Sequence, residues 1–298
     1  MRRNVGTINL TDSGSPTLLE MAEPRRFHGM RQSVISELNS LFRTSVYFHQ
    51  ILEKEPVLVD AGNYVADESL IREARAIQSI LHTDDPHAVL IQPSLSASPV
   101  IFRYRRLPFS QVIALRNRGE KPNLLTANLI ATDLEKQLII LHHRSPKSHL
   151  YPDMLSIPGG GFCPPDGLGR SGEMHITGTA SREFNEETRL TAHIRNDTAI
   201  VLTEEPETGA VQFNFLGATT QIPDNRNSGW EGDVMVIHFN ALYETLVTRK
   251  WAPLGKSCVL AWLALGAPGT ENAIFDGLTA DALYRKYINA MNIPEGSG

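Results

Sequence analysis

Three glutamates, Glu183, Glu186 and Glu187, lie within five positions of one segment. In the sequence ASREFNEETRL, residues 180 to 190, polar and apolar side chains recur at the three- and four-residue spacings of an amphipathic helix. On such a helix the carboxylates converge on one side and repel each other by roughly a few tenths of a kcal/mol per pair. The pattern predicts a compensating cation, and magnesium fits because it joins carboxylates to substrate phosphates. Manganese is the second candidate, and a solvated helix face is the competing interpretation.

A glycine-rich turn precedes this helix. Gly159, Gly160 and Gly161 follow Ile157 and Pro158 at the end of a strand-like stretch. Glycines in such a turn let backbone N–H groups approach a phosphate closely, although an ordinary strand-ending turn has the same composition. Together, the turn and the acidic helix favour a site that binds phosphate and metal.

The two segments resemble the signature of the Nudix hydrolase family, G-x5-E-x7-R-E-U-x-E-E-x-G-U, in which U is aliphatic or aromatic. The stretch from Arg182 to Glu187 matches R-E-U-x-E-E completely, and Leu190 stands at the final U. The resemblance covers this box and, by strand order, roughly residues 122 to 265. It implies a mixed α/β fold in which helices enclose a mixed sheet as an α/β/α sandwich. It also implies metal-dependent hydrolysis of the pyrophosphate bond in a nucleoside diphosphate linked to another moiety, such as a nucleotide sugar or ADP-ribose.

Two positions depart from the signature. The glycine expected after E-E-x is Arg189, and because an arginine in the left-handed conformation costs on the order of 1 kcal/mol, we expect a slightly extended helix. The first glutamate of the signature should lie eight residues before Arg182, at Met174, but the nearest acid is Glu173. A bulge in the intervening loop would restore Glu173 to the site.

The resemblance assigns roles to the residues of the box. Glu183, Glu186 and Glu187 are expected to bind the metal ion, with Glu173 as a fourth ligand if the bulge forms. Arg182 is expected to be structural, pairing with a nearby carboxylate and orienting it. Phe184 is expected to pack the helix on the sheet.

Residues outside the box complete the expected site. Glu231, in a later loop, is the best placed further acid, and Glu231, Glu186 and Glu187 are the candidate catalytic residues. Arg144 ends the strand-like stretch QLIILHHR and is expected to contact phosphate, as are Gly159 to Gly161. Trp230 either stacks on a base or anchors its loop. Other candidates carry less weight: Glu204, Glu205 and Glu207 as alternatives to Glu231, and His142 and His143 as residues of a strand end.

Periodicity predicts the elements that position these residues. Helices are indicated from Met30 to Phe42, from an N-cap at Asp67 to Leu81, and from about Ala280. Strands are indicated by AVLIQ and PVIFRYR, by LLTANLIAT and QLIILHHR joined through a DLEK turn, and near residues 198–202, 211–221 and 234–239.

A chain of 298 residues is typical of about two domains. We expect a small α+β domain over residues 1–116, beginning with a loose tail, and the Nudix-like domain over residues 122–298. The segment NRGEKPN, residues 117–123, marks the junction. The first domain could act as a lid, a dimer arm or a second binding module. A dimer arm, which would make the protein a homodimer, is the simplest of the three.

The amino-acid composition limits the kinds of partner that the protein can bind. The formal net charge of -5 provides no broad cationic surface for long nucleic acid, whereas a small nucleotide remains compatible. The apolar stretches, such as SCVLAWLALGA from Ser257, fall short of the ~20 residues that cross a bilayer, and no secretory signal opens the chain. Two cysteines, Cys163 and Cys258, are too few for a disulfide framework. We therefore expect a cytoplasmic protein without a membrane partner.

A second class of function also fits the sequence. A Nudix fold without catalysis could sense a nucleotide and pass the signal through the N-terminal residues. The displaced Glu173 and the replacement at Arg189 favour such a sensor, and the intact R-E-F-N-E-E stretch opposes it.

Overall fold

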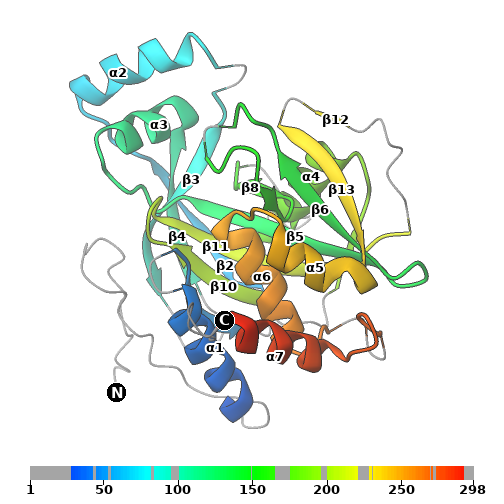
Figure 1. The fold of residues 1–298 in the computed structure, drawn as a ribbon. Helices are drawn as coiled ribbons and strands as arrows, with labels where there is room; N and C mark the ends of the chain where they lie inside the picture. The colour runs from blue at the N-terminus through cyan, green and yellow to red at the C-terminus, as the bar shows by residue number, and fades with distance from the viewer. Residues whose placement is uncertain are drawn as a thin grey trace, which may run out of the picture.

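The computed structural model describes residues 28–42, 45–52, 55–81, 84–94, 101–148, 150–164, 175–195, 200–220, 228–229, 231–268, 270 and 273–291. These residues form a mixed α/β fold, as predicted, with a large sheet, a small sheet and helices around them (Figure 1). The large sheet has the order β1-β10-β11-β5-β6-β13-β12, with β7 paired to β6, β8 to β5 and β9 to β11. The predicted tail before residue 28 lies outside the described residues.

The bounds of the elements are as follows. The strands of the large sheet are β1 (Tyr47–Leu52), β5 (Leu125–Asp133), β6 (Leu138–Arg144), β7 (Leu155–Ser156), β8 (Gly159–Gly161), β9 (His193–Ile194), β10 (Ile200–Glu205), β11 (Ala210–Ala218), β12 (Ser228–Gly229) and β13 (Gly232–His238). The small sheet contains β2 (Val57–Asn63), β3 (Pro86–Ser94) and β4 (Ile101–Pro108). The helices are α1 (His28–Phe42), α2 (Glu68–Gln78), α3 (Phe109–Asn117), α4 (Ile176–Thr188), α5 (Leu242–Thr248), α6 (Pro253–Ala264) and α7 (Ala280–Met291).

The large sheet is mixed, as the sequence predicted. Strands β5 and β11 run parallel, whereas β5 and β6 form the antiparallel hairpin expected around DLEK. In its turn the Asp133 carboxylate accepts a hydrogen bond from the backbone N–H of Lys136 at 3.1 Å. Because β5 and β6 are antiparallel, the start of β5 and the end of β6 lie at the same end of the sheet.

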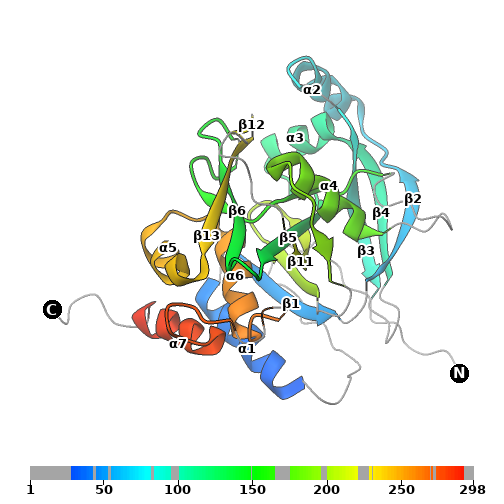
Figure 2. The ribbon, with the colours of Figure 1, turned by 90° about the vertical axis from the view of Figure 1, so that its right-hand side faces the viewer.

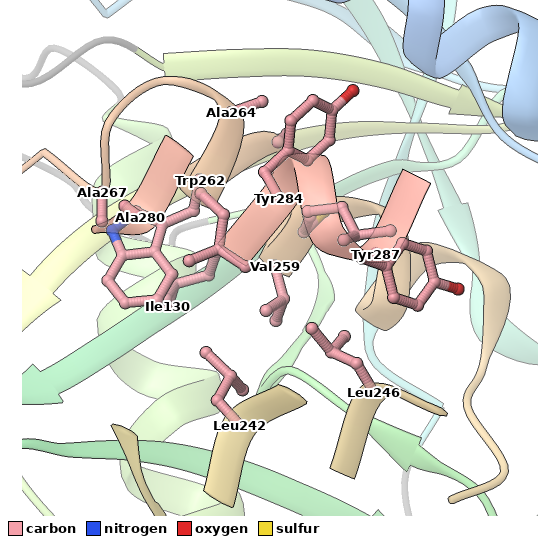
Figure 3. Packing of buried hydrophobic residues seen from close by; sticks show 14 of the residues in the cluster. Ile130, Leu242, Leu246, Val259, Trp262, Ala264, Ala267, Ala280, Tyr284 and Tyr287 are labelled. Atoms are coloured by element: carbon pink, nitrogen blue, oxygen red, sulfur yellow. The ribbon is translucent and has the colours of Figure 1, made fainter. Parts of the chain in front are cut away.

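Helices cover both faces of the large sheet. Along β5, Leu129 and Ala131 point into the apolar cluster that contains Phe184 of α4, whereas Ile130 points into the cluster built by α1, α5, α6 and α7. Figure 3 shows the second cluster, in which Val259 and Trp262 of α6 lie among side chains of α5 and α7. The sheet is therefore the middle layer, with α4 on one side and α6 on the other.

The small sheet packs on the α4 side. Phe102 of β4 meets Phe213 of β11 edge to face at 5.2 Å between ring centroids, and Tyr104 meets Phe162 at 5.4 Å. In Figure 2, α4 lies between the large sheet and the small sheet. Residues from the N-terminal part of the chain thus stand next to the acidic helix.

The predicted N-terminal helices are present. Helix α2 begins after Asp67, whose carboxylate accepts the backbone N–H of Leu70 at 2.7 Å, as expected for an N-cap. Strand β1 pairs with β10 of the large sheet, and α1 packs in the same apolar cluster as α6. A domain division after residue 116 stays a prediction, and it must accommodate these two links.

Helix α6 contains the apolar stretch noted in the sequence. Ten of its residues are buried, because the helix is enclosed by the sheet, α1, α5 and α7. In the part of the chain that the structure describes, no helix is long and apolar enough to cross a membrane. Neither Cys163 nor Cys258 forms a disulfide bond.

Candidate active site

Helix α4 is anchored by its apolar side. Ile176, Ala180 and Phe184 are fully buried, so that this side faces the sheets and the glutamates lie toward the end of the sheet where β6 stops. Phe184 packs in the apolar cluster between α4 and the large sheet.

The end of α4 corrects one expectation. The helix is not extended beyond the box, because it ends at Thr188 and Arg189 adopts the left-handed conformation, with φ 59° and ψ 18°. The next residue, Leu190, is buried, and its backbone N–H donates to Thr188 Oγ1 at 3.1 Å. The Asn185 side chain donates to the Leu190 carbonyl at 3.1 Å. These contacts hold Leu190 in the core, so the chain turns at Arg189 despite the missing glycine.

The glycine turn meets α4 directly. Strand β8 pairs with β5, and the backbone N–H of Gly159 donates to Glu187 Oε2 at 3.0 Å. A Cβ atom on Gly160 would lie 2.3 Å from the carboxyl carbon of Glu183. The turn therefore approaches so closely that a side chain at position 160 would displace the Glu183 carboxyl group, and at Gly159 its N–H binds a glutamate of the box.

Arg182 joins the acidic side chains to the turn. Its guanidinium lies 2.8 Å from Glu183 Oε1 and 2.9 Å from Glu186 Oε2, and it donates to the Gly161 carbonyl at 2.9 Å. These contacts match the pairing expected from the resemblance. That its role is to orient the carboxylates stays a prediction.

The acidic cluster concentrates negative charge. Burial raises the pKa of Glu183 to about 8; Arg182 opposes this rise, and Glu187, Glu186 and Glu231 add to it. Burial also raises the pKa of Glu231, and Glu187 raises it further, whereas His142 and Arg144 lower it. Glu231 thus lies within electrostatic reach of the box although it is 44 residues beyond Glu187 in the sequence. A cation placed here would relieve the repulsion.

Two basic side chains of β6 face this cluster. His142 Nδ1 lies 3.1 Å from Glu187 Oε1, and both side chains are almost completely buried. Arg144 stands two residues further on the same face of the strand, and its Nε donates to the Leu150 carbonyl at 3.0 Å. The sequence interpretation of His142 as a residue of the strand end missed this contact. Its spacing of two from Arg144, which places both on one face, is the signal that could have found it.

The N-terminal part of the chain reaches the glycine turn through His87. A Cβ atom on Gly161 would lie 2.3 Å from His87 Cδ2, and the imidazole stacks on Phe109 at 4.7 Å between ring centroids. Burial lowers the pKa of His87. Nothing in the spacing of the sequence predicted this contact, because it depends on how the small sheet packs.

The remaining predicted residues fall in three places. Glu173 and Trp230 lie outside the described residues. Glu204 pairs with His49 at 2.9 Å. Glu205 and Glu207 accept hydrogen bonds from the Tyr151 hydroxyl at 2.8 Å and 3.5 Å.

The donor atoms fit a hard divalent cation in type. They are carboxylate oxygens, which suit magnesium and manganese. Within the described ranges, however, no group of three or more His, Cys, Asp or Glu side chains is arranged to hold a metal ion. Arg182 lies against Glu183 and Glu186 instead. Arg182 contacts one oxygen of each carboxylate, so the guanidinium and a bound cation would share these two side chains.

Comparison with known proteins gives similarity in structure alone. No family model and no curated protein matches the chain. One similar solved structure is a bifunctional NMN adenylyltransferase/ADP ribose pyrophosphatase from Francisella tularensis, complexed with AMP and a Mn ion. It is 16% identical, with a TM-score of 0.39, over 51% of this chain and 45% of that one.

Two further similar structures are named as Nudix proteins, the family that the motif indicated. A Nudix hydrolase from Nitrosomonas europaea is 17% identical, with a TM-score of 0.36, over 52% of this chain and 99% of that one. The Nudix domain of Shewanella oneidensis NrtR, complexed with ADP ribose, is 15% identical, with a TM-score of 0.31, over 46% of this chain and 84% of that one. Because these TM-scores lie below 0.5, the proposals below rest on the geometry of this chain.

Proposed function

We propose that the protein hydrolyses the pyrophosphate bond of a nucleoside diphosphate linked to another moiety, such as a nucleotide sugar or ADP-ribose. Water attacks one phosphorus atom, the bridging P–O bond breaks, and the products are a nucleoside monophosphate and the phosphorylated second moiety. Magnesium is the expected cofactor, with manganese as the alternative.

One observation carries this proposal: the acidic helix α4 and the glycine turn β8 are joined through Glu187 and Glu183. Glu187 accepts the Gly159 N–H, and the carboxyl group of Glu183 stands against Gly160. Burial, together with the charges of Glu187, Glu186 and Glu231, raises the pKa of Glu183 to about 8, so its ionised form is unfavourable in the absence of a cation. Both features are those expected of a site that combines a cation with a diphosphate.

The contacts of each residue suggest its role in the hydrolysis. Glu183, Glu186 and Glu187 would hold the cation, which when bound would polarise phosphate oxygens and lower the pKa of a bound water. Glu231 would accept the proton of the attacking water, because burial and the charge of Glu187 raise its pKa. Glu187 is less suited to this step, since one of its oxygens binds Gly159 and the other faces His142. Arg144 would neutralise phosphate charge at the end of β6.

A turnover screen with a matched variant tests the proposal. ADP-ribose, nucleotide sugars, NADH and nucleoside triphosphates are incubated with the protein in magnesium or manganese, and release of nucleoside monophosphate is measured. We expect turnover of at least one substrate, and loss of about 100-fold or more in the double variant Glu186→Gln and Glu187→Gln. Equal turnover by the folded double variant would overturn the assignment.

A nucleotide sensor without catalysis is the second candidate. It is favoured by the two departures from the family signature, the displaced Glu173 and Arg189 in place of the glycine. Isothermal titration calorimetry with ADP-ribose separates the two functions. A sensor would bind without turnover in either metal, whereas an enzyme would release product.

Three further expectations belong to this proposal. Residues 1–116 would form a separate domain, the protein would act in the cytoplasm, and two copies would associate through the N-terminal part. Light scattering of the purified protein tests the homodimer.

A further inference from the structure

His142 is the most completely buried basic side chain beside the acidic cluster. It lies on β6, on the face that α4 covers, and is 1% exposed. Its two ring nitrogens make no hydrogen bond of acceptable geometry with the described residues. Burying an imidazole without hydrogen-bond partners is unfavourable, which points to another group that interacts with the ring.

That other group is the Glu187 carboxylate. Nδ1 lies 3.1 Å from Glu187 Oε1, which is within ion-pair range although the angles are not those of a hydrogen bond. The opposite carboxylate oxygen is held by the Gly159 N–H. Glu187 is thus placed between β8 on one side and β6 on the other.

The other side of the ring is closed by Gly232. A Cβ atom at this position would lie 2.7 Å from His142 Nε2 and 2.1 Å from the His143 carbonyl oxygen. The backbone of β13 therefore lies directly against the ring and leaves it little freedom to move away from Glu187. Gly232 also follows Glu231, so the same backbone segment carries the ring's neighbour and the expected base.

We propose that His142 is a positioning residue, which holds the Glu187 carboxylate in the orientation that binds the divalent cation. The inference rests on the proposed function, because it assigns His142 to that same site. His142 touches neither metal nor substrate and acts through Glu187. Residues that orient metal ligands in this way typically contribute 10- to 100-fold to metal affinity, as a rough range.

Manganese binding, followed by electron paramagnetic resonance of the free ion, tests the inference in four proteins. They are wild type, His142→Leu, His142→Asn and His143→Leu. Leucine fills much of the space without a polar atom, whereas the asparagine amide nitrogen can take the place of Nδ1. His143→Leu is the matched control, because His143 is the adjacent residue of β6, points to the opposite face and lies 3.2 Å from Asp153.

We expect His142→Leu to raise the Kd for manganese by about 10- to 100-fold, with His142→Asn and His143→Leu within about threefold of wild type. The kcat should fall in His142→Leu under saturating metal while KM changes little, because the displaced carboxylate acts on the reacting centre rather than on substrate binding. Equal manganese affinity in wild type and His142→Leu would overturn the inference, as would equal weakening by leucine and asparagine.

Two controls distinguish a failure of the inference from misfolding of a variant and from a failure of the proposed function. If His142→Leu does not fold, His142→Gln replaces it, because its longer side chain carries the amide nitrogen to the place of Nε2; it should weaken manganese binding where asparagine does not. Equal affinity of these two amide variants would overturn the inference. Wild type that binds no manganese would overturn the proposed function itself, whereas wild type that binds manganese independently of His142 would overturn only the positioning role.

Discussion

Helices α4 and α6 pack on opposite faces of the large sheet, and a glycine lies at the contact in both places. On the α6 side, a Cβ atom on Gly255 would lie 2.6 Å from the Cα atom of Ser156 and 3.1 Å from the backbone nitrogen of Ile157. On the α4 side, the three atoms nearest to a Cβ atom on Gly160 would all belong to the carboxyl group of Glu183. Gly255 thus leaves room for the backbone at Ser156, whereas Gly160 leaves room for the charged end of the Glu183 side chain.

The difference shows how the molecule divides stability and chemistry between two faces. Ten of the twelve residues of α6 are buried, and each fully buried side chain of the size of Leu260 stabilises the fold by about 1.5–3 kcal/mol. Helix α4 uses Phe184 for the same purpose but directs Glu183 and Glu187 into a space where their charges repel. One face provides a rigid support, and the other keeps an unfavourable charge arrangement that a ligand can relieve.

The largest effect is expected from Gly160→Ala. The added methyl group would displace the Glu183 carboxylate by about 1 Å, and a misplacement of this size reduces turnover by about 100-fold. The melting temperature should stay within about 2 °C of wild type, because the end of a flexible side chain moves rather than the backbone. Kinetics at saturating magnesium and a thermal melt measure both quantities. Wild-type turnover in this variant would show that Glu183 is not held in a functional position.

The matched substitution Gly255→Ala should give the opposite result. Its methyl group would press on the backbone of Ser156, and such overpacking costs about 3 kcal/mol, of which about 1 kcal/mol is returned by the better helix propensity of alanine. We therefore expect the free energy of unfolding in urea to fall by about 2 kcal/mol, with turnover per folded molecule unchanged. A loss of turnover without a loss of stability would remove the contrast between the two faces.

The charge on the α4 side should appear in the pH dependence of stability. The pKa of Glu183 is about 8 in the folded protein against a usual value of 4.5. A group whose pKa rises on folding binds more protons in the folded state, so its contribution is present below pH 4.5 and is lost as the pH rises to about 8.

Metal-free wild type should therefore lose stability between pH 5 and pH 8 by on the order of 1–2 kcal/mol more than Glu183→Gln, which stays neutral. Urea unfolding in EDTA at several pH values measures the difference, and added magnesium should reduce it. Glu135→Gln, in the exposed turn between β5 and β6, is the control and should follow wild type. Parallel pH profiles for wild type and Glu183→Gln would show that this carboxylate is already compensated.

The sequence predicts the parts of the site that depend on local spacing. Glu183 and Glu187 share one side of α4 because residues four apart lie one turn apart, and this rule needs no knowledge of the rest of the chain. The contact between His142 and Glu187 was missed because it depends on how α4 packs over β6. His87 was missed for the same reason, since it arrives from the small sheet.

The fold shows the same limit. Helices with one apolar side, such as α2 and α7, appear in the sequence as a periodic pattern, whereas α6 is buried on nearly every side and shows no clear period. The pairing of β1 with β10 joins residues about 150 positions apart and leaves no local signal. Arg189 shows the converse error. Arginine disfavours the left-handed conformation, so the sequence predicted a longer helix, but this local preference is overridden because Leu190 is buried in the core.

The smallest effect is expected at Arg189, where this local preference is overridden. Arg189→Gly removes the left-handed strain at the end of α4. The larger conformational entropy of glycine in the unfolded chain offsets part of this gain in stability. We expect a stabilisation of about 1 kcal/mol or less, seen as a rise in melting temperature of roughly 2–4 °C at most. Arg189→Ala is the control, because it shortens the side chain but keeps the strain, and it should melt with wild type. If both variants stabilise equally, the arginine side chain rather than the backbone is unfavourable, and the glycine of the family signature would be replaceable here without strain.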